Sequence, residues 1–311
     1  MPIIRVQHHA AHASSLAGEH PDIENWLVFT WDGVGYGSDG TLWGGEALAG
    51  RPGGWNRVAS FRPFHLVGGD KAGREPWRSA AALVWGVNES RAWPAPTDPD
   101  VGADAHRHYT STSSPAAKPY SLHSLRYARE TLNLAHQAWE RRANTFETSA
   151  AGRLFDAAAA LVLGRNMASF EGQGPMELEH FAADGCEAVS LPLSMDGQGV
   201  LRSDWEPLLD RLIDQDVSAE TRAGIFHESM AQALLDQALT ARESVEFDAV
   251  GLSGGVFQNR RLTERVVELL QAKGIDVRLH KEIPANDGGL SFGQIIEAFS
   301  IANEFTLTNQ R

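Results

Sequence analysis

The sequence predicts an α/β protein in which a mixed sheet of five strands is interrupted by a large helical insertion. Apolar runs separated by glycine-rich turns predict three antiparallel strands, at residues 26–31, 41–48 and 58–65. Two strand-to-helix repeats near the end of the chain predict a parallel pair, at residues 249–252 and 276–280. The segment between these groups, about residues 66–245, is patterned mainly as helix.

The first helix is expected over residues 5–16, which are rich in alanine and free of Gly and Pro until Gly18. Periodic apolar positions predict further helices at residues 74–86, 122–142, 151–163, 175–183, 205–214, 221–243, 259–273 and 291–301, and a short strand is expected at 188–193. Residues 87–120 are rich in Pro, Ser, Asp and His. We expect them to form an irregular, mobile loop.

Composition excludes several classes of function. The 311 residues carry a formal net charge of −13, which argues against a nucleic-acid-binding surface and against binding to anionic membranes. The longest apolar run, 157–163, is too short to span a bilayer, and residues 1–20 lack the apolar core of a signal peptide. The single cysteine, Cys186, excludes an internal disulfide framework and fits a cytoplasmic protein.

Two histidines on the first predicted helix form a candidate metal site. His8 and His12 are four residues apart, so both imidazoles lie on one face of a helix, whereas His9 points elsewhere. The spacing is that of the first half of a zinc-protease motif without its glutamate. The alternative is a helix that carries histidines without binding a metal.

Two aspartates lie at predicted strand ends beside glycines. Asp32 precedes Gly33 and Gly35, whose lack of side chains lets the backbone approach a ligand closely. Asp287 lies at a later junction between strand and helix. Such junctions gather along one edge of an open sheet, so both carboxylates are expected to face one crevice. Either aspartate could instead satisfy a turn or cap a helix.

A third junction, Gly254 and Gly255 followed by Asn259, comes after a strand and opens a helix. Backbone N–H groups and the helix dipole favour a phosphate at such a place. The spacing matches neither the P-loop nor the dinucleotide fingerprint, so a simple tight turn is the alternative.

Three further positions are candidates for binding a ligand. Asp156 could accept hydrogen bonds from ribose hydroxyls, or could be an exposed helical acid. Gly172 could line a base or a sugar, or form a turn. Arg74 lies beside an aromatic residue and suits an anionic substrate, or could begin a solvated helix. Two His and two Asp suit Zn, Fe or Mn, and beside a phosphate turn they indicate metal-assisted phosphate or acyl chemistry.

Eight short motifs occur in one order along nearly the whole chain: VQHHAAH (6–12), WDGVGYG (31–37), WGGE (43–46), GGDKAGREPWR (68–78), TSAAGRLFD (148–156), FEGQG (170–174), LSGGVFQN (252–259) and ANDGG (285–289). Together they resemble the C-terminal carbamoyltransferase region of the hydrogenase maturation factor HypF. That region is related to the threonylcarbamoyl transferases and to the O-carbamoyltransferases.

The resemblance implies a ribonuclease H-like lobe of the actin/Hsp70 type. It implies a divalent metal, with Zn, Fe, Mn and Mg not distinguished, held by His8, His12, Asp32 and Asp287. It also implies an adenine nucleotide. The phosphate would lie near Asp32 and the Gly254–Gly255 turn, and the nucleoside near Asp156, Gly172 and Asn259.

The resemblance further implies an activity. Carbamoyl phosphate and ATP would yield a carbamoyl-adenylate, and the carbamoyl group would pass to the C-terminal cysteine of a HypE-like partner in the maturation of [NiFe]-hydrogenase. The nucleophile would belong to the partner, so this chain needs none. The alternatives are O-carbamoylation of a small molecule and a non-enzymatic accessory role in the maturation complex.

The chain also departs from the family pattern. The upstream acylphosphatase-like, zinc-finger and adenylating domains are not in the sequence, and we expect the first lobe to be largely absent. Residues 1–20 would then be the helix left from that lobe, and residues 21–311 the second lobe with its insertion. A bare inter-lobe surface would be apolar, and a homodimer or a partner chain would cover it.

Overall fold

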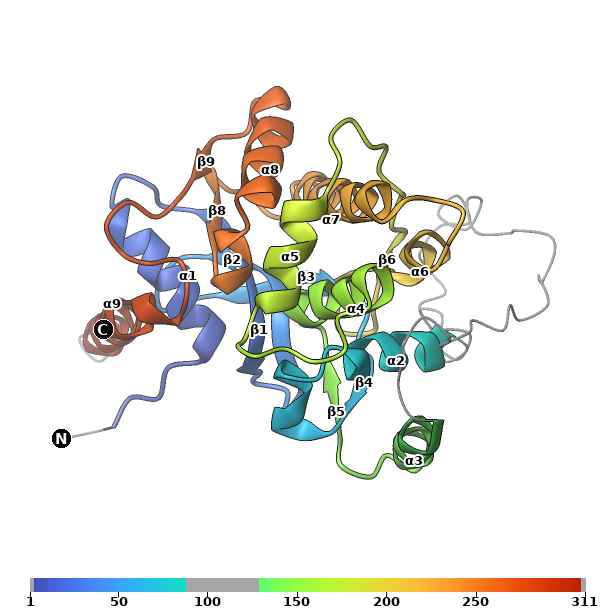
Figure 1. Ribbon diagram of the computed structural model, residues 1–311. Coiled ribbons are helices and arrows are strands. Elements are labelled where there is room, and N and C mark those ends of the chain that lie inside the picture. Colours follow the sequence, from blue (N-terminus) through green and yellow to red (C-terminus); the bar gives the residue numbers. More distant parts are fainter. Residues whose placement is uncertain (1–2, 88–128, 309–311) are drawn as a thin grey trace, which may run out of the picture.

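The structure, a computed structural model, describes residues 3–87 and 129–308. A mixed sheet crosses the centre of the molecule and helices cover both of its faces (Figure 1). The expected loop at 87–120 lies outside the described residues except at Val87, as does the first part of the helix expected at 122–142. The α/β class with a mixed sheet, predicted from the sequence, is confirmed.

The described strands are β1 (Trp26–Tyr36), β2 (Leu42–Gly50), β3 (Asn56–Phe61), β4 (Phe64–Val67), β5 (Thr145–Thr148), β6 (Leu193–Met195), β7 (Leu201–Ser203), β8 (Ala249–Ser253) and β9 (Val277–Arg278). They follow the order β6-β7-β3-β2-β1-β8-β9, while β5 pairs with β2 and with β4. The antiparallel group β1–β2–β3 and the parallel pair β8–β9 are those expected from the sequence, whereas the parallel pairing of β1 with β8, which joins them, was not predicted.

The described helices are α1 (His8–Glu19), α2 (Trp77–Gly86), α3 (Arg129–Glu140), α4 (Ala151–Leu163), α5 (Gln173–Phe181), α6 (Glu206–Leu212), α7 (Ala219–Ala241), α8 (Arg260–Ala272) and α9 (Leu290–Thr308). Short 3₁₀ turns, η1 (Gly69–Gly73), η5 (Gly255–Gln258) and η6 (Asp287–Gly289), lie at junctions between these elements.

The sheet has nine strands in the described part of the chain, where five were expected. The run predicted as one strand at 58–65 is two strands, β3 and β4, because Pro63 between them cannot donate to a ladder. Among the other strands, β5 and β7 were not expected, and the short strand expected at 188–193 is β6, which begins only at Leu193. These three strands are three or four residues long and come from the segment between 66 and 245. Runs this short carry little periodicity to detect.

The strand β1 is buried on both faces, and its alternating residues divide the core into two clusters. Trp26 and Val28 pack toward α1, in a cluster that includes Leu16. Leu27, Phe29 and Trp31 belong to the larger cluster on the other face.

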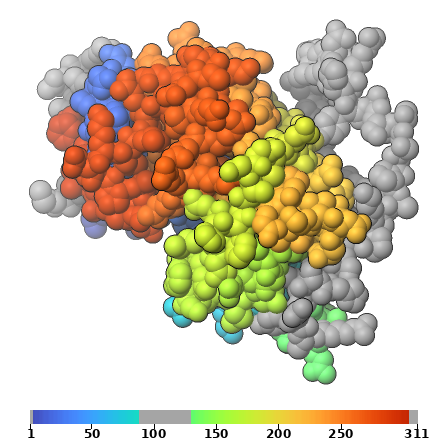
Figure 2. Space-filling model, turned by 45° about the horizontal axis from the view of Figure 1, so that its top comes forward, coloured from blue at the N-terminus to red at the C-terminus, as the bar shows by residue number. Residues whose placement is uncertain are grey.

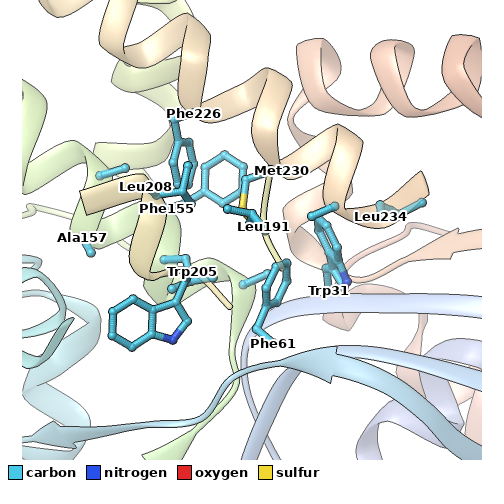
Figure 3. Packing of buried hydrophobic residues seen from close by; sticks show 14 of the residues in the cluster. Trp31, Phe61, Phe155, Ala157, Leu191, Trp205, Leu208, Phe226, Met230 and Leu234 are labelled. Atoms are coloured by element: carbon cyan, nitrogen blue, oxygen red, sulfur yellow. The ribbon is translucent and has the colours of Figure 1, made fainter. Parts of the chain in front are cut away.

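Figure 3 shows part of the larger cluster, in which sheet residues meet residues from α4 and α7. The Trp31 and Phe61 rings lie with their centroids 5.1 Å apart. Phe155 and Phe226 meet edge to face at 4.8 Å, which joins α4 to α7. This packing holds β1 and α4 rigidly beside one another.

The helix α1 lies against the sheet and beside α9, at the same end of the molecule as both termini (Figure 1). Gln7 caps its first turn, because the Gln7 side-chain oxygen accepts a hydrogen bond from the Ala10 N–H at 2.7 Å. His20 ends it. The expected first helix is therefore confirmed, with its start shifted to His8.

Candidate metal centre and the adjoining cavity

The first turns of α1 present His8 and His12 on one face, as their spacing predicts. The His12 side chain is buried, whereas that of His8 is partly exposed. Their rings meet edge to face with centroids 4.8 Å apart. His9 points away from them and is wholly buried beside Trp43. The imidazoles of His8 and His12 therefore both face a neighbouring element.

That element is β1, which carries Asp32. A glycine-rich turn was expected to begin at Asp32, but the strand continues to Tyr36. Its register against β2 shifts between Trp31 and Gly35, so Asp32 lies in a bulge. Bulges redirect side chains that would otherwise lie flat in the sheet. The Gly33 N–H donates to Asp32 Oδ1 at 2.8 Å, which leaves Oδ2 directed toward the histidines.

The fourth member, Asp287, opens η6 after β9. Asn286 takes the capping role, since its side chain accepts from the Gly288 N–H at 3.0 Å. Asp287 is therefore free of that role, and its carboxylate oxygen lies 3.4 Å from His12 Nε2 and 3.7 Å from His8 Nε2.

One donor atom from each of His8, His12, Asp32 and Asp287 can be chosen so that all four lie within 4.8 Å of one another. Asp32 Oδ2 is 3.2 Å from His8 Nε2 and 3.1 Å from His12 Nε2. Ligand atoms bound tetrahedrally at ~2.1 Å are about 3.4 Å apart, close to the His–Asp separations of 3.1–3.7 Å, so the donor set suits one small divalent cation. Two imidazoles with two carboxylates suit several such metals and do not distinguish between them.

Protonation of the cluster follows from these contacts. Burial raises the pKa of Asp32, but hydrogen bonds from His12 and His8 outweigh burial and hold that pKa well below its usual range. Burial lowers the pKa of His12, but hydrogen bonds to Asp287 and Asp32 outweigh it and raise the pKa. In the metal-free state a proton is therefore held where a cation would bind, and metal binding would release it.

A cavity of about 640 Å³ adjoins the cluster, within the size range of small-molecule sites. Asp32 and Asp287 form one end of its lining. The remaining lining comes from β1, from α4, from α5 and the residues just before it, and from the loops after β8 and β9. In Figure 2 the segments around residues 150–180 (yellow-green) and 255–290 (orange to red) lie next to each other on the displayed face.

Several residues proposed from the sequence line this cavity together: Asp32, Gly33, Asp156, Gly172, Gly255, Asn259 and Asp287. A side-chain carbon on Gly255 would lie 3.0 Å from Asp32 Oδ1, so glycine allows the loop after β8 to approach that carboxylate. The preceding Gly254 has φ 103° and backs onto the Trp31 carbonyl, one step behind the lining.

Two of the proposed residues lie elsewhere. Arg74 is exposed and is not part of the cavity lining, because η1 directs it to the surface. Gly35 is buried under the rings of His8 and His9, where it supports the metal cluster and not a nucleotide. Sequence spacing alone did not predict that Arg74 and Gly35 would lie outside the cavity.

The cation that lines the cavity is Arg153, which the sequence analysis did not single out. Arg153 Nε donates to the Gly33 carbonyl at 3.2 Å, and Nη1 lies 2.9 Å from Asp156 Oδ2. Glu171 Oε1 lies 3.4 Å from Nη2. The signal was available, because Arg153 and Asp156 are three residues apart in one motif and so share a helix face.

Asp156 is buried, which contradicts the alternative of an exposed helical acid. Its Oδ2 forms the ion pair with Arg153 Nη1 at 2.9 Å but accepts no well-directed hydrogen bond from the residues that the structure describes. Burial raises the pKa of Asp156 to about 6, despite the opposing charge of Arg153. The carboxylate is therefore ionised at neutral pH but incompletely satisfied within the described chain.

Asn259 caps α8, since Oδ1 accepts from the Leu262 N–H at 2.8 Å. Its Nδ2 lies 3.0 Å from Nε2 of the buried His227, whose Nδ1 faces the Ala223 carbonyl at 2.8 Å. Burial lowers the pKa of His227 to about 4, so the ring is neutral. With Nδ1 protonated, Nε2 accepts from Asn259, which orients the amide.

Among the described residues, no helix is both long and apolar enough to cross a bilayer.

The fold and the cluster define an α/β protein in which four residues could hold a metal ion, and two of them, Asp32 and Asp287, also line a cavity of about 640 Å³. Residues 28–294 match the family described as "Carbamoyltransferase, Kae1-like Domain, second subdomain". The chain therefore belongs to the HypF carbamoyltransferase family, and it corresponds to the C-terminal region of HypF.

Two curated relatives illustrate the match. Carbamoyltransferase HypF of Synechocystis sp. is 33% identical over 300 residues, which are 95% of this chain and 37% of the relative. A carbamoyltransferase HypF homolog of Cupriavidus necator is 33% identical over 304 residues, covering 94% of this chain and 70% of the relative. The chain thus spans little more than a third of the length of the Synechocystis protein.

Solved structures agree. A crystal structure of full-length HypF in a phosphate- and nucleotide-bound form superposes with a TM-score of 0.78 and 28% identity, covering 97% of this chain and 36% of that one. The crystal structure of T. kodakarensis HypF gives a TM-score of 0.73 and 28% identity, covering 96% and 37%.

Proposed function

We propose that this chain catalyses carbamoyl transfer in hydrogenase maturation, from a carbamoyl-adenylate to the C-terminal cysteine of a HypE-like partner. The observation that carries the proposal is the convergence of His8, His12, Asp32 and Asp287 at one end of the 640 Å³ cavity. Membership of the HypF family supports the reaction type.

The adenylate would lie along the cavity, with its phosphate beside Gly33 and Gly255 near the metal cluster. Asp156 would accept hydrogen bonds from the ribose hydroxyls, which agrees with its buried oxygen that accepts no well-directed hydrogen bond from the described chain. Arg153 would hold Asp156 in place and add positive charge beside the phosphate. Gly172 and Asn259 would border the nucleoside.

His8, His12, Asp32 and Asp287 would hold one divalent cation. When bound, that cation would supply Lewis acidity toward the carbamoyl carbonyl or the adenylate phosphate. The protein's own contribution is to hold Nε2 of both imidazoles 3.1–3.2 Å from the Asp32 carboxylate, so that they are directed at one point.

The nucleophile would be the thiolate of the partner. It would attack the carbamoyl carbon, a C–S bond would form, and the bond from that carbon to the adenylate oxygen would break with release of AMP. The single cysteine of this chain is unsuited to the role. Cys186 lies near the Ala183 and Thr221 carbonyls, and burial raises the pKa of its thiol.

A second chain would also cover α9. Ile295 and Phe299, one turn apart on this helix, are each 67% exposed. Adjacent large apolar side chains on one helix face are typical of an interaction surface. This exposure supports a homodimer or a partner chain on that face.

The test supplies the chain with carbamoyl phosphate, ATP, a separately purified adenylating domain and a HypE-like acceptor, and the acceptor is weighed by mass spectrometry. A carbamoyl adduct on its C-terminal cysteine is expected, and it should be absent with the D32N variant. No adduct with the adenylating domain present would refute the proposal.

A further inference from the structure

The residues around Asp287 do little to fix the position of its carboxylate. Its side chain is 69% exposed, and it lies at the end of an irregular segment, 279–286, that follows the two-residue strand β9. A cation can use Asp287 only if this segment is kept beside α1. The contacts that hold this segment in place therefore affect the metal site.

The anchor is Glu19, the last residue of α1. Its Oε1 accepts from three consecutive backbone N–H groups, those of Lys281 at 3.2 Å, Glu282 at 2.7 Å and Ile283 at 3.1 Å. Successive N–H groups that converge in this way form a nest for an anion. The Glu19 side chain is 8% exposed, so these bonds are little screened by water.

Glu19 stands where a carboxylate is otherwise unfavourable. The C-terminal end of a helix carries partial negative charge, which disfavours an acid there. Burial likewise raises the pKa of Glu19, but the backbone N–H groups and His280 outweigh it and lower the pKa. The acid is thus stabilised by the segment that it holds.

A second contact ties the same segment to the helix through a serine. His280 Nδ1 lies 2.8 Å from Glu19 Oε2, and its Nε2 lies 2.9 Å from Ser253 Oγ. Ser253 Oγ is also 3.0 Å from the backbone carbonyl of His12. A carboxylate can only accept, so the Nδ1 proton of His280 faces Glu19.

The order Ser–His–Glu has the geometry of a hydrolytic triad, but Ser253 cannot act as a nucleophile. Ser253 is fully buried at the end of β8, and it does not line the cavity. The three side chains instead connect the segments of the chain that carry the metal ligands. His12 lies about two turns from Glu19 on the same helix, and Asp287 follows the segment that Glu19 binds.

We infer that Glu19, with His280 and Ser253, is a positioning residue that sets the distance between Asp287 and the histidine pair. The inference rests on the metal site of the proposed function. The next residue along, Gly254, completes the arrangement, because its N–H donates to the Ala285 carbonyl at 2.7 Å.

The experiment titrates Zn²⁺ into the full chain, freed of metal by a chelator, in competition with a coloured chelator. E19Q keeps the shape of the side chain but removes its charge, and should weaken Zn²⁺ binding about 10- to 100-fold. The matched control is D196N. Asp196 also accepts from two backbone N–H groups in a loop and pairs with Arg202, away from the cluster.

A double-mutant cycle separates positioning from general loss of structure. If Glu19 acts by placing Asp287, then E19Q should change Zn²⁺ affinity less than about 2-fold in a D287N background. Should E19Q not fold, S253A takes its place. Its control, S229A, removes the hydroxyl of another buried serine, which donates to the Ile225 carbonyl.

Each outcome decides the inference. Unchanged Zn²⁺ affinity in E19Q, equal weakening in D196N, or additive losses with D287N would overturn the positioning role and leave the metal site intact. Equal affinity of the wild type and D32N would instead refute the metal site itself, and the inference with it, without any Glu19 variant.

Discussion

His12 Nε2 lies 3.1 Å from Oδ2 of Asp32, which joins the first helix to the bulge in the first strand. The contact crosses from α1 to β1, and neither partner is exposed enough for water to replace it readily. It defines the point at which a cation would be held. Four predictions concern this point and the cavity beside it, and a fifth concerns the exposed face of α9.

Replacing His12 by alanine should abolish the thermal stabilisation that a divalent metal confers. Zn²⁺ at 100 times its dissociation constant stabilises a protein by about 2.7 kcal/mol, and a variant without the ligand should gain none of this. Differential scanning fluorimetry with and without Zn²⁺ measures the effect. H180A, which removes an exposed histidine on α5, is the control and should respond as the wild type does.

Gly35 should not tolerate a larger residue, because there is no room for a side chain at this position. A side-chain carbon there would come within 2.5 Å of ring atoms of both His8 and His9. We expect G35A to displace His8 and weaken Zn²⁺ binding about 10-fold or more. G197A is the control, because the corresponding carbon at Gly197 meets nothing within 4 Å. Equal affinities for the two variants would contradict the crowding described here.

The stability of the metal-free protein should depend on pH through Asp156. Its folded-state pKa of about 6 exceeds the unfolded value of ~3.9, so the folded state binds the proton more tightly between these values. The free energy of unfolding should therefore rise, relative to D156N, as the pH falls. Between pH 7 and pH 5 the gain is about 1 kcal/mol. Urea unfolding of both proteins at the two pH values measures it, and a constant difference would show that Asp156 titrates normally.

Asn259 should contribute separately to stability and to nucleotide binding. Serine is as good a helix cap as asparagine, so N259S should retain about 1 kcal/mol that N259A loses. Both variants lack the amide that contacts His227 and borders the cavity. Nucleotide affinity, measured by calorimetry with AMP, should therefore fall in both. Wild-type affinity in N259S would limit Asn259 to its role as a cap.

The exposed residues of α9 should control association. If Ile295 and Phe299 form a homodimer surface, the double variant I295E/F299E should sediment as a monomer and the wild type as a dimer. A monomeric wild type would rule out the homodimer and leave a different chain as the covering partner. Binding of Zn²⁺ by the variant serves as the control for folding.

Local sequence was sufficient for features whose cause is local. Four-residue spacing places His8 and His12 on one helical face, and alternation along β1 directs Trp26 and Leu27 to opposite cores. The helix at 151–163 was located to the residue, since a glycine at Gly164 ends it in the left-handed conformation. Membership of the family likewise followed from ordered motifs, because their spacing along the chain is itself a sequence property.

Other features arose only when distant segments packed. The spacing of Arg153 and Asp156 within α4 could have indicated Arg153, but the exclusion of Arg74 from the cavity could not be inferred, because the path of η1 places Arg74 at the surface. The burial that shifts the pKa of Asp156 arises only when α4 packs against other elements, among them α5, α7 and β1. From the sequence alone, Glu19 is an ordinary acidic residue near the end of a helix. It meets the backbone of 281–283 only because the parallel pairing of β8 with β1 and β9 brings residues more than 260 positions apart together. Such contacts depend on the register of the whole sheet, which no local propensity encodes.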